Sequence, residues 1–204
     1  MTGTRRPAKL SRLTANTSKK YRQLIQMGLF MSHVAPFKPR QVIIRGQAYQ
    51  IRQAEANRRQ ISQLLYLEAE DYDGATPWDG EAFKRELTKP NCLYLACYAG
   101  DQLAAAIGMR FGYVQAHITF VAVAPARQGQ GVAGCLLRLM IDLAKAAGYK
   151  RLTLEVAVDN QRAIAVYRHL GFEENFKREG YYTHPDGSTM DALEMIMYLG
   201  RKKQ

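Results

Sequence analysis

Hydrophobic and polar residues follow regular periods from about residue 45 onward, and the order of these periods predicts an α/β domain. Alternating or short apolar runs bounded by turn residues predict about seven strands, at residues 48–53, 93–98, 103–111, 115–123, 152–158, 172–182 and 190–199. Apolar stripes at helical spacing predict four helices, at residues 57–70, 79–88, 129–147 and 160–169. This succession of elements is typical of a mixed sheet that is covered by helices.

Local signals support several of these boundaries. Asp79 is suited to cap the second helix, because its side chain can accept a hydrogen bond from a free amide of the first turn. Gly148 is suited to end the long third helix. Residues 99–102, Ala-Gly-Asp-Gln, are typical of a hairpin turn between two strands.

The first 45 residues differ in composition from the rest of the chain. Residues 1–40 contain nine Lys or Arg and no Asp or Glu, so that only +2 of the net charge of +11 belongs to residues 41–204. We therefore expect a basic N-terminal extension at 1–45, which can be disordered, and one folded domain at 46–200. Residues 21–31 have the spacing of a short amphipathic helix. Three interpretations of residues 1–40 stay open: a tail that touches the ribosome or other RNA, an upstream start with Met27 or Met31 as the real first residue, and a targeting peptide.

Composition argues against several classes of protein. No apolar run approaches the roughly 20 residues of a membrane span, and we expect no membrane partner. Three cysteines (Cys92, Cys97 and Cys135) without a C-x-x-C pair favour free thiols over disulfides or structural zinc. The four histidines include no pair at helical spacing, so we expect no metal. These features predict a protein of the cytoplasm.

A glycine-rich segment at the start of the long helix is the first candidate binding site. Gly129-Gln-Gly131-Val-Ala-Gly134 fits the dinucleotide fingerprint, and Glu155 lies at the distance expected for a ribose ligand. Four residues separate this segment from the preceding strand, and only about fifty follow Glu155, too few for a doubly wound sheet. Amides at a helix start bind anions in either fold, so a phosphate or pyrophosphate site is predicted. A glycine-rich turn without a ligand stays the alternative.

Two motifs resemble those of the GCN5-related N-acetyltransferases (GNAT). Gln128, Gly131 and Ala133 match the family's phosphate loop, and Asn160-Gln-Arg-Ala-Ile-Ala-Val-Tyr167-Arg-His-Leu-Gly-Phe172 matches a longer family pattern downstream. The resemblance covers about residues 48–199. It implies the GNAT fold, with helices on both faces of a sheet that splays between its fourth and fifth strands, and acetyl-coenzyme A (acetyl-CoA) as co-substrate. The residues it implies for binding acetyl-CoA are Val121, Ala122, Val123, Gln128, Gly129, Gln130, Gly131, Val132, Ala133, Gly134 and Asn160.

Within this superfamily the chain is most similar to RimI-like enzymes, which acetylate the N-terminal amine of a small-subunit ribosomal protein. The supporting segments are Pro77-Trp78, Leu154-Glu155-Val156, Gly180-Tyr181-Tyr182, Asp186-Gly187 and Asp191-Ala192. One departure is Phe120, near which an Asn is expected. The resemblance therefore implies a protein N-terminus as partner, and we expect Tyr181 and Tyr182 to line the substrate channel. The acidic run Glu68, Glu70, Asp71 and Asp73 could attract a basic peptide, although such a run is usually a solvated helix end.

Two residues are candidates for acid and base catalysis. Tyr167 matches the family's general acid, which protonates the departing thiolate; its alternative role is simple core packing. Glu155 lies on a strand that should be apolar on both faces, where a carboxylate is costly to bury without a partner or a task. We expect desolvation to raise the pKa of Glu155 and to make it a base. The alternative is a solvated Glu at the open end of the splayed sheet.

These residues favour acetylation of a protein N-terminal α-amine by direct transfer in a ternary complex. An α-amine, with an ordinary pKa of about 7.7–8.0, loses its proton more easily than lysine at about 10.4, so a modest base suffices. Two alternatives stay open: acetylation of a small amine, and a basic protein associated with ribosome or RNA in which this fold has lost catalysis.

Overall fold

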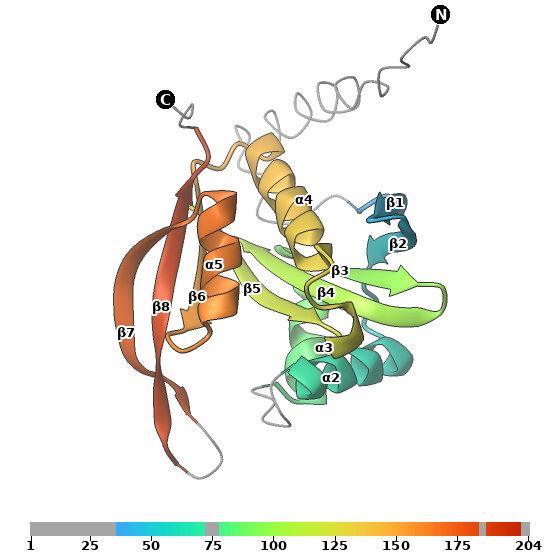
Figure 1. Ribbon diagram of the computed structural model, residues 1–204, viewed down its shortest axis with the longest axis horizontal. Coiled ribbons are helices and arrows are strands. Elements are labelled where there is room, and N and C mark those ends of the chain that lie inside the picture. The colour runs from blue at the N-terminus through green and yellow to red at the C-terminus, as the bar shows by residue number, and fades with distance from the viewer. Residues whose placement is uncertain (1–35, 72–77, 184–186, 201–204) are drawn as a thin grey trace, which may run out of the picture.

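The computed structural model describes residues 36–71, 78–183 and 187–200 (Figure 1). Its strands are β1 (Arg40–Ile44), β2 (Gln47–Gln53), β3 (Cys92–Ala99), β4 (Gln102–Phe111), β5 (Ala116–Val123), β6 (Arg151–Ala157), β7 (Glu173–Thr183) and β8 (Thr189–Tyr198). Its helices are α2 (Arg58–Asp71), α3 (Gly80–Thr88), the 3₁₀ turn η2 (Pro125–Arg127), α4 (Val132–Ala146) and α5 (Gln161–Leu170). The expected α/β class and the order of its elements are confirmed.

The strands form a single mixed sheet in the order β1-β2-β3-β4-β5-β6-β8-β7. Only β5 and β6 pair in parallel within the described residues. The sheet has eight strands, whereas the sequence predicts about seven. The additional strand is β1, which lies inside the range 1–45 that was expected to be an extension. A two-residue turn joins β1 to β2, with positive φ at both Arg45 and Gly46 (49° and 84°), as type I′ hairpins require.

Helices cover both faces of the sheet, as expected (Figure 1). Helices α4 and α5 pack on one face, over a core that includes Leu95, Ile107, Leu136 and Ile164. Helices α2 and α3 pack on the other face, over a smaller core of Leu64, Phe83, Tyr94 and Phe120. Alternate residues of β3 contribute to the two cores, because successive side chains of a strand point to opposite faces.

A bulge in β5 changes which residues face each core. Gly108 of β4 lies opposite Phe120, but its neighbour Met109 lies opposite Ile118, which leaves Thr119 as the extra residue. Ile118 therefore belongs to the core under α4, while Phe120, two residues later, belongs to the core under α2 and α3. Bulges redirect side chains in this way and increase the local twist of a strand.

Strands β5 and β6 part soon after they begin to pair. Their register runs from Ala116 opposite Leu152 to Ile118 opposite Leu154, and it continues no further along the described strands. In Figure 1 the two strands run apart below this point. This is the expected splay between the fourth and fifth predicted strands, and it exposes one backbone edge of β5 from Thr119 to Val123.

Helix boundaries follow from local chemistry. Asp79 Oδ1 accepts a hydrogen bond of 2.6 Å from the amide of Ala82, which confirms the predicted cap of α3. Helix α4 ends at Ala146, and Gly148 follows with φ of 85°. No helix among the described residues is long and apolar enough to cross a membrane.

Candidate active site

Glu155 lies where β5 and β6 part, and it is paired with a histidine. Glu155 Oε2 is 2.9 Å from Nε2 of His117 on β5, and the side chains are 10% and 26% exposed. On its other side the His117 ring is held by Thr153, whose Oγ1 is 2.8 Å from Nδ1. Thr153 Oγ1 also accepts a hydrogen bond of 3.2 Å from Gln115. The sequence points to Glu155 alone, and the structure adds His117.

A cation from β7 approaches Glu155 from the opposite side. Arg178 Nε is 3.3 Å from Glu155 Oε1, while Arg178 Nη2 donates a hydrogen bond of 2.8 Å to Glu194 Oε2. Asn175 donates to the other oxygen of Glu194 at 2.7 Å. Glu194 stands opposite Glu155 in the register of β6 and β8. Arg178 therefore bridges two carboxylates that would otherwise repel each other.

These partners correct the expected pKa of Glu155. Burial does act to raise it, as the sequence suggests. The hydrogen bond from His117 and the nearby charges of His117 and Arg178 outweigh burial, so the pKa of Glu155 lies below its ordinary value. Glu155 is therefore a carboxylate held in its ionised form, not a carboxyl group with a raised pKa.

Of the two tyrosines expected at the substrate channel, Tyr181 lies near Glu155. Burial and then the negative charge of Glu155 raise the pKa of Tyr181. The ring of Tyr182 packs edge-on against that of Tyr181, with centroids 5.0 Å apart. Both tyrosines come from β7.

Tyr167 lies on the other face of the sheet. It is 8% exposed within the core under α4 and α5, and its ring centroid is 5.9 Å from that of Phe172. On β6, Leu154 and Val156 face this same core, whereas Glu155 points to the opposite face. The two candidate catalytic residues therefore flank β6 from opposite sides.

The glycine-rich segment has the backbone shape of a turn that opens a helix. Gly129 and Gly131 have φ of 73° and 89°, a conformation that residues with a Cβ rarely adopt. Helix α4 starts at Val132 with Gly131 as its N-cap; glycine offers no side chain to the first amides, and the first turn of α4 contains no acidic residue. The helix start thus offers free amides and a positive dipole end to an anion.

Three other residues expected at the acetyl-CoA site have bonds within the protein. Gln128 donates to the carbonyl of Val123 at 3.1 Å and so ties the loop to the end of β5. Gln130 donates to the carbonyl of Ala126 at 2.7 Å. Asn160 caps α5 by accepting from the amide of Ala163 at 3.0 Å. These bonds fix the shape of the site.

Residues 58–172 match the acetyltransferase (GNAT) family. The chain belongs to this family. Acetyl-CoA is the co-substrate of this family, which favours the acetyltransferase interpretation of the glycine-rich loop over the dinucleotide one. Binding of the acetyl-CoA phosphates by residues 128–134 stays a prediction. Among the described residues, no group of His, Cys, Asp or Glu is arranged to hold a metal ion.

Comparison with individual proteins gives the same family. The chain is 36% identical over 120 residues to N-alpha-acetyltransferase RimI of Mycobacterium tuberculosis, a match that covers 57% of this chain and 74% of that protein. A structure of the ribosomal-protein-S18-alanine N-acetyltransferase from Escherichia coli has a TM-score of 0.66 and 27% identity, covering 76% of this chain and 97% of that one. An uncharacterized protein of Mycobacterium leprae is 36% identical over 126 residues, but the match spans only 34% of its length.

Two parts of the structure are suited to hold acetyl-CoA. The phosphate loop, residues 128–134, offers free helix amides for the pyrophosphate. The backbone edge of β5 at Val121, Ala122 and Val123 lies beyond the end of the pairing with β6, where an extended pantetheine arm can add like a strand. When bound, acetyl-CoA supplies the acetyl group as a thioester.

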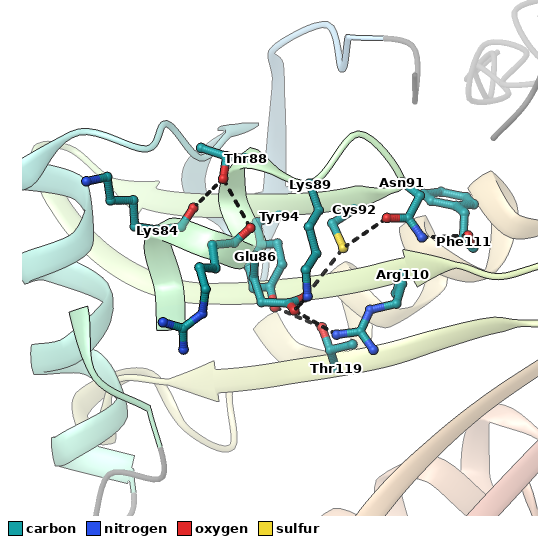
Figure 2. Close-up of polar contacts among 11 residues, drawn as sticks. Lys84, Glu86, Thr88, Lys89, Asn91, Cys92, Tyr94, Arg110, Phe111 and Thr119 are labelled. Atoms are coloured by element: carbon teal, nitrogen blue, oxygen red, sulfur yellow. Dashed lines mark hydrogen bonds and ion pairs between the residues drawn. The ribbon is translucent and has the colours of Figure 1, made fainter. Parts of the chain in front are cut away.

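A second polar cluster anchors α3 to the sheet next to this site (Figure 2). Glu86 of α3 is buried, and it forms ion pairs with Lys89 and, at 2.8 Å, with Arg110 of β4. Burial acts to raise the pKa of Glu86, but its bonds to Lys89 and Arg110 prevail and lower it. Arg110 is the register partner of His117. The cluster therefore holds α3 against the strand that neighbours the catalytic histidine candidate.

The acidic run at the end of α2 is only partly a solvated surface. Glu70 is exposed, but Glu68 is fully buried, and desolvation raises its pKa to about 8. A carboxyl group in this state is protonated at neutral pH and attracts no basic peptide. Asp73 lies outside the described residues, as do Pro77 and Asp186. The predicted helix at 21–31 and most of the basic extension are also outside them.

Proposed function

We propose that this acetyltransferase modifies the N-terminal α-amine of a protein, with ribosomal protein bS18 as the substrate, by direct transfer in a ternary complex. Relatives named as ribosomal protein bS18-alanine N-acetyltransferases support this proposal, among them an Escherichia coli enzyme that is 33% identical over 123 residues. A ribosomal-protein substrate also favours a cytoplasmic location, as does the presence of free thiols.

The single observation that carries the mechanism is the ion pair of His117 and Glu155 at the parting of β5 and β6. A carboxylate held in its ionised form attracts an ammonium group and orients it. An α-ammonium group has an ordinary pKa of about 7.7–8.0, so it needs only a weak base to lose its proton near neutral pH. We assign the His117–Glu155 pair as the base that takes up this proton, either directly or through a water molecule.

Transfer then needs a second proton on the opposite side of β6. The neutral amine attacks the carbonyl carbon of the thioester, a C–N bond forms and the C–S bond breaks. The nitrogen gives up its second proton to solvent as the amide forms, while Tyr167, on the face away from Glu155, donates its hydroxyl proton to the departing sulfur and then regains a proton from solvent. Separate groups on the two faces can thus serve the amine and the sulfur without exchanging protons with each other.

Peptide acetylation followed by mass spectrometry tests the proposal. The full chain is mixed with acetyl-CoA and a peptide that carries the N-terminus of bS18, and thiol release is followed over time. We expect acetylation on the α-amine, and none on a matched peptide whose α-amine is already blocked but whose lysines are free. Acetylation of polyamines or aminoglycosides, with the peptide left unmodified, would refute the proposed substrate and favour the small-amine alternative.

The basic extension remains a separate prediction from charge alone. Residues 1–40 could contact ribosomal RNA, and such contacts weaken steeply with salt. A binding assay with ribosomes at rising salt, using the full chain and a chain that starts at residue 36, tests it. Salt-sensitive RNA binding together with no thiol release would favour the non-catalytic alternative.

A further inference from the structure

Arginine side chains gather around the phosphate loop, in addition to the residues that the resemblance implies for binding acetyl-CoA. Arg45 Nη1 donates to the carbonyl of Gly129 at 3.1 Å, and Arg162 Nη1 donates to Oε1 of Gln128 at 2.6 Å. Arg162 Nη2 is also 3.5 Å from where a Cβ on Gly129 would stand. The two guanidinium groups therefore lie at the same exposed glycine, one arriving from the β1–β2 turn and the other from α5.

The β1–β2 hairpin is packed against the loop, so the position of Arg45 is set by the fold. Ile44, the last residue of β1, has its Cγ2 atom 3.7 Å from where a Cβ on Gly131 would stand. Tyr49 of β2 is buried, and its hydroxyl lies 3.5 Å from Oε1 of Gln130. The type I′ turn between the two strands then carries Arg45 to Gly129.

This arrangement is electrostatically unfavourable without an anion. The start of α4 is the positive end of a helix dipole, where cations are disfavoured. The first turn of α4 contains no acidic residue. Within the described part of the chain, neither Arg45 nor Arg162 forms an ion pair with a carboxylate. Arg138 adds a third guanidinium group, 3.4 Å from the carbonyl of Gly134.

We propose that Arg45 and Arg162 bind phosphate groups of acetyl-CoA, in addition to the loop amides. Coenzyme A carries a pyrophosphate and a 3′-phosphate, more negative charge than one helix start can match. A guanidinium group that gives one N–H to a carbonyl keeps further donors for a bidentate contact with phosphate. The proposal makes the hairpin of β1 and β2 part of the acetyl-CoA site. It rests on the family's co-substrate and is independent of which amine is acetylated.

Calorimetric binding of acetyl-CoA to Arg45→Ala and Arg162→Ala tests the proposal without any acceptor amine. We expect each variant to bind acetyl-CoA about tenfold more weakly, the effect of losing one charge-assisted contact. The weakening should shrink as salt is raised, because screening reduces the contribution of the charge in the native protein. Repeating the titrations with 3′-dephospho-acetyl-CoA identifies the phosphate: the loss disappears if the 3′-phosphate is the partner and persists if the pyrophosphate is.

Two controls separate phosphate binding from a structural role. Arg59→Ala removes an exposed arginine from α2, on the other face of the sheet, and should bind acetyl-CoA like the native protein. Acetyl-pantetheine, which has no phosphate, should compete equally well for the native protein and for Arg45→Ala. Native affinity for acetyl-CoA in both arginine variants would overturn the proposal. An equal loss of affinity for acetyl-pantetheine would also overturn it, because Arg45 would then only hold the loop in shape.

Discussion

His117 Nε2 and Glu155 Oε2 lie 2.9 Å apart on β5 and β6, two strands whose pairing ends next to them. His117 is the second of three residues of β5 in register with β6, and Glu155 is the first residue of β6 beyond that register. The pair therefore stands at the apex of the gap between the strands. Beyond this pair the two strands part, and one edge of β5 is left unpaired by β6.

Replacing His117 with Ala should shift the pH dependence of catalysis. In the native protein burial acts to raise the pKa of Glu155, but His117 and Arg178 lower it by more. The pKa of Glu155 therefore lies below its ordinary value of 4.5. Without His117 the effect of burial remains and its main opponent is lost, so the pKa of Glu155 rises. We expect the acidic limb of kcat/KM to move to higher pH, with turnover at neutral pH about 100-fold lower.

Rates measured with a bS18 N-terminal peptide between pH 4.5 and 9 check this shift. His169→Ala, which removes an exposed histidine from α5, is the matched control and should keep the native profile. An unchanged acidic limb in His117→Ala would show that Glu155 does not titrate as part of this pair.

Tyr167→Phe should separate catalysis from binding. The phenyl ring keeps its packing against Phe172, while the proton for the departing sulfur is lost. We expect kcat to fall about 100-fold, with the dissociation constant of acetyl-CoA unchanged and unfolding free energy altered by about 1 kcal/mol or less. Steady-state kinetics, calorimetry and urea unfolding measure the three quantities. A native kcat would assign Tyr167 to the core alone.

Gly108→Ala should destabilise the fold through a steric clash next to the site. A Cβ on Gly108 would lie 2.4 Å from Cε1 of Tyr94. That ring cannot move aside easily, because it packs against Trp78 and Phe120 and its hydroxyl is 3.0 Å from Oγ1 of Thr119. We expect a loss of about 1–3 kcal/mol in unfolding free energy.

Gly80→Ala provides the control for this substitution. At the start of α3 a new Cβ meets only ordinary contacts, 3.6 Å from Ile61 and 3.8 Å from Leu65. Alanine favours helices, so this variant should be as stable as the native protein or gain up to about 1 kcal/mol. Equal unfolding midpoints in urea for the two variants would contradict the clash.

Periodicity was enough to predict most of the fold, because each predicted strand or helix buries one face and its sequence shows that face locally. Strand β1 was not predicted. Its apolar residues lie in a segment whose composition is dominated by positive charge, and its turn places Arg45 as well as Gly46 at a positive φ. The pattern Val42-Ile43-Ile44-Arg45-Gly46, an apolar run before a two-residue turn, was the available signal.

The candidate site was predictable only where it is local in sequence. The phosphate loop and Glu155 stand out because glycines and a carboxylate are unusual in their predicted elements. The partners of Glu155 depend on register: His117 faces it across the end of a parallel pair, and Arg178 reaches it across β8. Contacts between distant segments cannot be inferred from the residue pattern of either segment alone. A histidine and a glutamate on the two strands expected to splay were the nearest hint.

Glu68→Gln should stabilise the protein increasingly as pH rises. Desolvation raises the pKa of the fully buried Glu68 from 4.5 to about 8. The folded chain thus holds a proton that the unfolded chain releases, so the stability linked to Glu68 is full below pH 4.5 and declines as pH rises toward 8. Glutamine has the same shape and no such loss, so its advantage should grow by about 3 kcal/mol between pH 5 and pH 8. Urea unfolding at both pH values measures it, with Glu173→Gln, an exposed position on β7, as the control that should show no such growth. A pH-independent difference between Glu68→Gln and the native protein would show that Glu68 is ionised in the folded chain.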